Sequence, residues 1–257
     1  LMVKIDETNN TASVIKSPKA SGTVLIPRSV QYKGKEYLIT SIKSFSFCNN
    51  EIDFLTFDDN SEIESFTEDV FNHVHLKKLK IPAKIKKLDF NWCKYIKNLT
   101  EIEISPNNHN FIYYNNEFLL GKSDINSKIY DVLYFARFDI EEAVIPPQVK
   151  IIKSHSFFYY NKLKSIICPE NSELKIIEKE AFSFSKIQKL VLPSSFEECK
   201  SFSNTDKLTN IQISSKSKLF AFFDRYLVKK SNAKNDVFDI LIFAPRDIEK
   251  VVIPSHI

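Results

Sequence analysis

The chain is poor in glycine: among its 257 residues it has only 3, Gly22, Gly34 and Gly121. Phosphate-binding loops need glycine at several neighbouring positions, because the backbone there adopts positive φ and approaches the ligand closely. We therefore expect no nucleotide-binding loop of the common kinds and no cofactor.

Segments that would direct or anchor the chain are also missing. No apolar run reaches the ~18 residues that a membrane-spanning helix needs, and Leu1–Asn10 lacks the pattern of a secretory signal. The sequence stops at Pro254–Ile257 in the middle of a repeating pattern. We therefore expect a fragment that is truncated at its C-terminal end, and the missing signals say little about the full-length protein.

Catalytic and metal-binding motifs are absent as well. The 4 cysteines include no CxxC pair, and neither GxSxG nor HExxH occurs. His73 and His75 are separated by one residue, but a metal site needs a third ligand and groups that orient it. The sequence thus predicts no metal site and no catalytic residues, and hence a protein that is not an enzyme.

The charge balance argues against nucleic acid as a partner. The 36 Lys and Arg residues oppose 32 Asp and Glu residues, a net charge of +4 at pH 7, and both signs are interspersed along the chain. A nucleic-acid-binding surface would combine a concentrated basic stripe, arginines and stacking aromatic rings. The composition, 43% hydrophobic and 26% charged, is typical of a folded domain.

A short motif recurs along the whole chain: an apolar residue, any residue, a second apolar residue, then proline or a small polar residue. Its most frequent spacing, about 23 residues, falls within the range of leucine-rich repeats. Two longer intervals leave room for insertions. The nine copies are Val24–Pro27, Leu55–Asp58, Leu79–Pro82, Ile102–Ser105, Ala143–Pro146, Ile166–Pro169, Leu190–Pro193, Ile211–Ser214 and Val251–Pro254.

Phenylalanine is abundant, with 22 residues. Between the strand motifs, Phe47, Phe71, Phe157 and Phe182 each follow an apolar residue by five positions, and Cys93 takes the same place in another repeat. One large ring per coil would fill the space between the two walls of a solenoid. We therefore assign these rings to the core and not to a binding role.

The two long intervals carry similar insertions. Leu99–Pro146 aligns with Leu208–Pro254 once a single residue is dropped, and in each insertion two apolar runs flank a polar stretch. This pattern predicts β-hairpins with solvated tips at about residues 111–135 and 220–243. A partial third copy opens the chain, so residues 1–22 are expected to form a partial N-terminal cap or hairpin.

The repeats resemble the BspA-like leucine-rich repeat family, the surface-antigen type of leucine-rich repeat protein. The two halves of the family pattern are carried by Leu163–Pro169 and by Ile177–Phe182. The turn glycine of the family is missing, and the alanine before the phenylalanine is often replaced by Ser or Val. The resemblance implies a mainly β, right-handed solenoid over residues 23–257, with about nine short parallel strands on its concave face.

The middle residue of each strand motif is expected to point away from the core, because side chains alternate along a strand. In this column, Val144, Ile167 and Val191 are consecutive and form an apolar stripe about 10 Å long, flanked by Glu142 and Lys189. Exposed apolar patches often mark contacts with a partner, so this stripe is a candidate protein-binding surface. Two alternatives remain open: β-branched residues suit strands in any case, and the hairpin at 111–135 would cover the stripe if it folded over it.

Three further features bear on function. Lys78, Lys80, Glu101 and Glu103 lie at outward positions of neighbouring strands, where opposite charges usually neutralise one another at little net gain. The projecting hairpins are another candidate surface, because their tips can vary without disturbing the core. Asn9 and Asn98 begin matches to the glycosylation acceptor pattern, which permits secretion without proving it.

The resemblance implies a protein-binding module of a cell-surface or secreted protein, acting in adhesion or in host–pathogen and cell interaction, with a protein partner that the sequence does not identify. The alternative is an intracellular, cytoplasmic scaffold that uses the same face for protein–protein interaction. Open solenoid ends expose core side chains unless they are capped. Homo-oligomers that form through these ends are therefore also expected.

Overall fold

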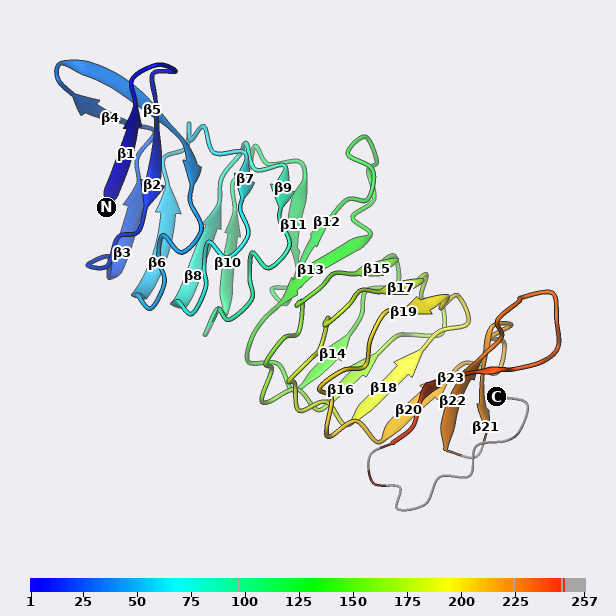
Figure 1. Ribbon diagram of the computed structural model, residues 1–257. Helices are drawn as coiled ribbons and strands as arrows, with labels where there is room; N and C mark the ends of the chain where they lie inside the picture. Colours follow the sequence, from blue (N-terminus) through cyan, green and yellow to red (C-terminus); the bar gives the residue numbers. More distant parts are fainter. Residues whose placement is uncertain (97, 224, 246, 248–257) are drawn as a thin grey trace. The chain divides into compact units, whose positions relative to one another are not determined.

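The computed structural model describes residues 1–96, 98–223, 225–245 and 247. It contains two compact units, Leu1–Asp139 and Ile140–Ile257, and each is described by itself. Figure 1 shows the first unit in blue to green and the second in green to red. The described residues form β-strands, turns and loops, and no helix among them is long and apolar enough to cross a membrane.

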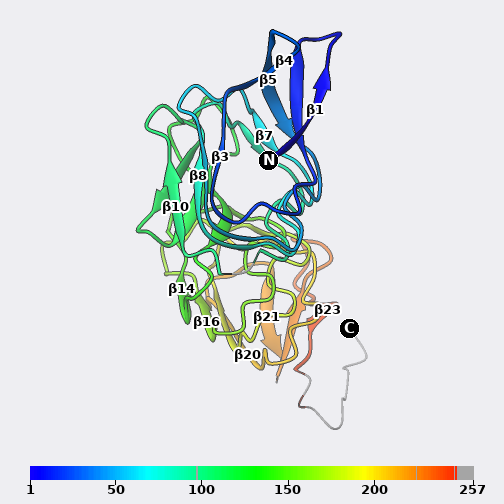
Figure 2. The same cartoon turned by 90° about the vertical axis from the view of Figure 1, so that its left-hand side faces the viewer.

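Each unit contains a sheet of four parallel strands, with one strand from each coil. In the first unit these strands are β3 (Gly22–Ile26), β6 (Glu51–Phe57), β8 (His75–Ile81) and β10 (Glu101–Ile104). In the second they are β14 (Glu142–Val144), β16 (Ser165–Ile167), β18 (Lys189–Leu192) and β20 (Asn210–Ile213). Figure 2 shows β3, β8 and β10 from a second side.

These strands confirm the predicted solenoid and its parallel strands. The first eight strand motifs all lie on them, and neighbouring strands pair in register, for example Lys78 with Glu101 and Ile166 with Leu190. The ninth motif, Val251–Pro254, lies outside the described residues.

The alternation of side chains predicted for the strands is also confirmed. In β3, Val24 and Ile26 are buried while Leu25 between them is 50% exposed. In β14 and the residue that follows it, Ala143 and Ile145 are buried on either side of an exposed Val144. Burial of two apolar residues per strand explains why the motif recurs, since each coil must contribute to one continuous core.

Opposite the parallel sheets, several coils contribute a second, shorter strand. In the first unit β7 (Ser65–Phe66) pairs in parallel with β9 (Lys87–Leu88). In the second, β15 (Ile151–Ile152), β17 (Ile176–Ile177) and β19 (Glu198–Cys199) pair in parallel. These short strands form the second wall of these coils.

The phenylalanine side chains that follow this second wall are core residues, as predicted. Phe47, Phe71, Phe157 and Phe182 are each at most 1% exposed. In the first unit the ring centroids of Phe47 and Phe71 lie 6.3 Å apart and stack. One ring per coil therefore fills the space between the two walls.

Cys93 takes the place of the phenylalanine in the third such coil, and a neighbour compensates for its smaller volume. Trp92 is 3% exposed, and its ring lies 6.2 Å from that of Phe66 and 6.3 Å from that of Phe71. The indole therefore supplies the aromatic volume that the thiol lacks.

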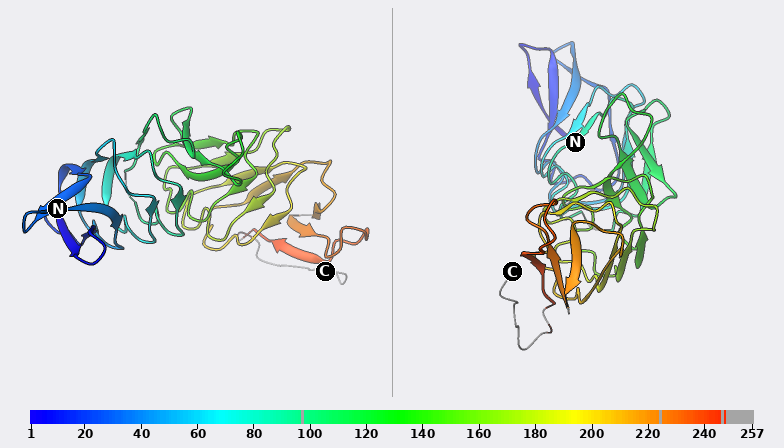
Figure 3. Two further views of the ribbon diagram at one scale, coloured as in Figure 1. Left: turned by 90° about the horizontal axis from the view of Figure 1, so that it is seen from above. Right: turned by 90° about the vertical axis from the view of Figure 1, so that its right-hand side faces the viewer.

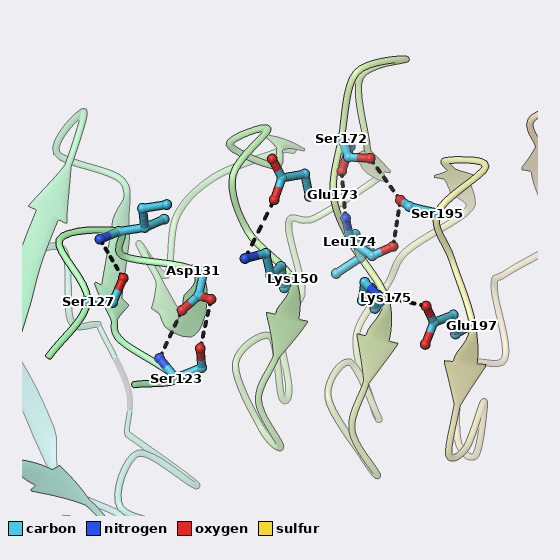
Figure 4. Close-up of polar contacts among 11 residues, drawn as sticks. Ser123, Ser127, Asp131, Lys150, Ser172, Glu173, Leu174, Lys175, Ser195 and Glu197 are labelled. Carbon is cyan, nitrogen blue, oxygen red and sulfur yellow. Dashed lines mark hydrogen bonds and ion pairs between the residues drawn. The ribbon is translucent and has the colours of Figure 1, made fainter. Parts of the chain in front are cut away.

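Polar side chains also connect successive coils of the second unit (Figure 4). Lys150 forms an ion pair with Glu173 at 3.7 Å, and Lys175 forms one with Glu197 at 2.9 Å. The hydroxyl of Ser195 donates to the backbone oxygen of Ser172 at 2.8 Å, one coil earlier. Such contacts link each coil only to its neighbours, as is typical of a solenoid.

The two insertions each contain the expected antiparallel hairpin, β12–β13 or β22–β23, and a third antiparallel strand that was not predicted. The first consists of β11 (Phe111–Tyr114), β12 (Phe118–Gly121) and β13 (Val132–Ala136). The second consists of β21 (Phe220–Phe223), β22 (Tyr226–Lys229) and β23 (Ile240–Phe243), in orange to red and seen from two further sides in Figure 3. We call them the first and second meanders.

The first apolar run is divided by a tight turn at Asn115 and Asn116. Both asparagines have positive φ, 50° and 55°, and the backbone N–H of Glu117 donates to the oxygen of Tyr114 at 3.0 Å. Positive φ at both central residues is the signature of a type I′ turn, which suits the twist of a hairpin. Because no glycine marks this turn, the run resembled a single strand in the sequence.

The same polar contact closes the long loop of each meander. In the first, the backbone N–H and hydroxyl of Ser123 donate to Asp131 at 2.8 and 2.7 Å (Figure 4). In the second, the backbone N–H and hydroxyl of Ser231 donate to Asp239 at 2.7 and 2.5 Å. The repeated contact supports the internal alignment of the two insertions.

Gly121 in β12 is required by close packing. A Cβ atom at this position would lie 2.7 Å from Cε2 of Tyr134 and 2.9 Å from Cε1 of Phe111. Gly34, in contrast, has a φ of 75° and nothing within 4 Å of such a Cβ atom. Gly121 is thus needed because there is no space for a side chain, whereas Gly34 is needed because its backbone adopts positive φ.

Residues 1–22, the expected N-terminal cap, contain β1 (Met2–Asp6) and β2 (Thr11–Ile15), which form an antiparallel hairpin. This hairpin belongs to a four-stranded sheet in which β2 also pairs with β5 (Lys35–Ile42), and β5 with β4 (Ser29–Tyr32).

Candidate protein-binding surface

The apolar stripe predicted from the sequence lies on the outward face of the β14–β16–β18–β20 sheet. Val144 pairs with Ile167, and Ile167 pairs with Val191, so the three side chains lie on adjacent strands in register. Val144 is 51% exposed, and the other two are partly exposed. Strand spacing of ~4.8 Å makes the stripe about 10 Å long.

Polar groups border the stripe two positions earlier in each strand. The hydroxyl of Ser165, a buried residue, donates to Oε2 of the exposed Glu142 at 2.8 Å. Lys189 is partly exposed and forms no ion pair with any residue that the structure describes. Glu142 and Lys189 therefore offer one acceptor and one unpaired cation beside an apolar centre.

The same face changes character at the last strand of the sheet. Gln212 pairs with Val191, and Asn210 pairs with Lys189, so both outward positions of β20 carry exposed amides. An apolar centre with a polar rim is the usual composition of a non-obligate protein interface.

The outward face of the first unit is dominated by charges that pair with one another. Lys78 lies 3.3 Å from Glu103 and 3.9 Å from Glu101, and Lys80 lies 2.8 Å from Asp59. The ammonium group of Lys78 also lies 4.8 Å from the ring centroid of Phe54. Exposed pairs of this kind contribute roughly 0–1 kcal/mol each, and here they leave little unsatisfied charge for a partner.

Beside these charges lies a shallow depression that was not predicted. It has a volume of about 450 Å³, and its lining includes Lys78, Glu101, Glu103, Tyr113 and Arg137. Burial raises the pKa of Tyr113 to about 12, while Arg137 is held by Asp139 at 2.6 Å. Because Tyr113 and Arg137 come from the first meander and the glutamates from β10, only the folded chain brings them together.

The two asparagines of the glycosylation pattern are both exposed. Asn9 lies in the turn between β1 and β2, and its side-chain amide donates to Asp6 at 2.8 Å. Asn98 has a φ of 66°, and its amide lies 3.3 Å from Nδ1 of His75. Among the described residues of the first unit, nothing buries either side chain.

The remaining chemistry-bearing residues have structural roles. His73 stacks on Tyr95 with ring centroids 4.5 Å apart. All four cysteines are free thiols, and Cys168 is buried at an inward position of its strand motif. Desolvation by burial raises the pKa of Cys93, Cys168 and Cys199 to about 12. Among the described residues no three of the His, Cys, Asp and Glu side chains gather into a group that could hold a metal ion.

A comparison with protein families matches the chain to the BspA-type leucine-rich repeat region, with six copies over residues 36–131 and 127–240. A comparison with curated proteins finds no match. Among solved structures, a leucine-rich repeat protein of Eubacterium ventriosum is 20% identical with a TM-score of 0.57, over 70% of this chain and 47% of that one. This likeness supports the fold alone.

Two other structures align over more of the chain but with lower TM-scores. A leucine-rich cell surface protein of Faecalibacterium prausnitzii is 18% identical with a TM-score of 0.47, over 90% of this chain and 59% of that one. The pneumococcal vaccine antigen PcpA is 18% identical with a TM-score of 0.40, over 89% and 54%. The chain thus spans about half the length of the structures that it resembles.

Proposed function

The chain belongs to the BspA-type leucine-rich repeat family, and from this premise we propose that it is a protein-binding module whose contact surface is the outward face of the β14–β16–β18–β20 sheet. The observation that supports this proposal is the in-register stripe of Val144, Ile167 and Val191. Leucine-rich repeat solenoids commonly use such extended surfaces for binding.

The size of the stripe defines its role in the contact. A stable protein interface buries about 800 Å² on each partner, far more than three side chains supply. The stripe would therefore be the apolar centre, and Glu142, Lys189, Asn210 and Gln212 would form the polar rim. Each aliphatic side chain that becomes fully buried contributes about 1.5–3 kcal/mol, so removing the central one should weaken binding measurably.

Substitution of Ile167 tests this surface. In Ile167→Glu a carboxylate replaces the central apolar side chain, and its desolvation would oppose any contact there. The matched control is Leu25→Glu, at the same motif position in the first unit, where Leu25 is 50% exposed and Ile167 is partly exposed. We expect capture of a specific binding protein from intact host or neighbouring cells to be lost with Ile167→Glu and kept with Leu25→Glu. Equal capture by both variants would rule out this face.

We also propose that the module acts at the cell surface or outside the cell, in adhesion or host interaction. The family resemblance supports this location, and the exposed Asn9 and Asn98 are compatible with it. Antibodies against the chain should stain intact source cells. Staining only after permeabilisation would instead support a cytoplasmic scaffold that uses the same face.

A further inference from the structure

A second exposed surface lies at the corners of the coils, where exposed side chains occupy backbone positions with left-handed φ. In five coils the residue seven positions after the second-wall apolar residue has positive φ: Asn49, His73 and Tyr95 in the first unit, and Tyr159 and Phe184 in the second. Left-handed φ is tolerated by Gly and Asn and is disfavoured for bulky side chains. Aromatic residues at such positions therefore need an explanation.

In the second unit the two rings form an exposed platform. Tyr159 has a φ of 67° and is 55% exposed, and Phe184 has a φ of 59° and is 47% exposed. Their ring centroids lie 5.7 Å apart. The buried Phe158 contacts Phe184 edge-on at 5.5 Å, which fixes the orientation of the platform.

The backbone holds this platform rigidly. The N–H of Tyr159 donates to the oxygen of Ser183 at 3.0 Å, and the N–H of Phe184 donates to the oxygen of Asn204 at 2.7 Å. These bonds join three successive coils at their corners. The positive φ values are thus imposed by the coil, and the choice of aromatic residues there is not required by the core.

A shallow groove of about 150 Å³ begins at the platform. Its polar lining comes from Asn161, Ser185, Lys186, Asn204, Asp206 and Lys207. Lys186 and Lys207 form no ion pair within the described part of the chain, whereas Lys164, Lys175 and Lys216 of the same unit do. Two unpaired ammonium groups against a single carboxylate leave the groove with an excess of positive charge.

We propose that this groove binds an acidic saccharide, that is, a sugar ring that carries a carboxylate. The negative faces of the aromatic rings favour the partly positive C–H bonds on one side of a sugar ring. The amides of Asn161 and Asn204 both donate and accept hydrogen bonds, as hydroxyl groups do. Lys186 and Lys207 would neutralise the carboxylate.

Single-stranded nucleic acid also stacks on aromatic rings, but it fits the groove less well. Its phosphates only accept hydrogen bonds and need a basic channel that follows the backbone. Here Asp206 lines the groove, and amides that accept as well as donate lie beside the rings. The site is separate from the outward sheet face, so Ile167→Glu should leave saccharide binding unchanged.

Titration of the full chain with four probes tests the proposal: sialyllactose, a hyaluronan tetrasaccharide, neutral lactose and oligothymidylate. We expect at least one acidic sugar to bind, with lactose about tenfold weaker or undetectable. Tyr159→Asn and Phe184→Asn should each weaken binding about tenfold or more. These variants should fold, since Asn49 naturally occupies the same slot with a φ of 60°, and circular dichroism checks this.

The matched control is Tyr95→Asn, which removes an aromatic ring from the same slot of the first unit (φ 63°) and should leave binding unchanged. Lys186→Gln combined with Lys207→Gln should reduce binding of the acidic sugar to the level of lactose. The proposal is overturned if neither acidic sugar binds, if lactose binds equally well, if only oligothymidylate binds, or if the asparagine variants bind like the wild type.

Discussion

Truncation of Phe71 to alanine is expected to destabilise the first unit by about 3–5 kcal/mol, the usual cost of removing a phenylalanine from a packed core. The ring is fully buried. Its centroid lies 5.2 Å from that of Phe66, 6.3 Å from that of Phe47 and 6.3 Å from that of Trp92. Because these neighbours belong to successive coils, none can move to fill the cavity without disturbing the next.

The single tryptophan of the chain makes the measurement specific. Trp92 belongs to this cluster, so its fluorescence during urea unfolding reports on the first unit. With a denaturant dependence of about 2 kcal/mol per molar urea, the midpoint should fall by on the order of 2 M. Cys93→Ala, in the equivalent slot of the next coil, removes one sulfur atom and should cost only about 1 kcal/mol. An unchanged midpoint in Phe71→Ala would refute the assignment of this ring to a close-packed core.

Three further outcomes follow from the described contacts. Urea unfolding should show a loss of about 1–3 kcal/mol for Gly121→Ala through overpacking, and roughly 1 kcal/mol for Gly34→Ala from backbone strain. The partly exposed Cys48 should react first with a thiol reagent, because burial raises the pKa of the other three thiols to about 12. Burial alone would raise the pKa of Glu178, but Lys153 at 2.6 Å and the Ser154 N–H lower it overall. The folded state therefore gains stability from the ionised Glu178 above the ordinary pKa of 4.5, and this stability is lost as the pH falls through the lowered pKa. In Glu178→Gln, the urea midpoint should consequently decrease less between neutral and acidic pH than it does in the wild type.

The parallel strands and the core were predictable because repetition supplies many copies of one pattern. A single apolar–x–apolar triplet is ambiguous, but nine copies, most of them about 23 residues apart, define which positions face inward. The same logic identified Phe47, Phe71, Phe157 and Phe182 as core residues. Register within the stripe followed as well, because Val144, Ile167 and Val191 hold the same motif position.

The turns of the meanders and the corner platform could not be predicted in this way. Positive φ is normally announced by glycine, but here asparagine, histidine and aromatic residues adopt it. Phe182 and Phe184 illustrate the difficulty: they are the same residue type two positions apart, yet one is buried and the other is 47% exposed. A signal did exist, since Asn49 holds the same slot as Phe184, and asparagine is typical of left-handed positions.

The contrast between the two sheet faces explains why the second is the better candidate for binding. On the first face, a partner that engaged Lys78 or Glu103 would have to break an existing ion pair and desolvate both charges, which largely cancels the gain from new contacts. On the second face, burial of Val144 and Ile167 breaks no ion pair and only releases water from apolar surface. Outward positions do not pack in the core, so they can differ between coils at little cost to stability. A repeat whose inward residues are nearly uniform can therefore carry one self-neutralised face and one face available to a partner.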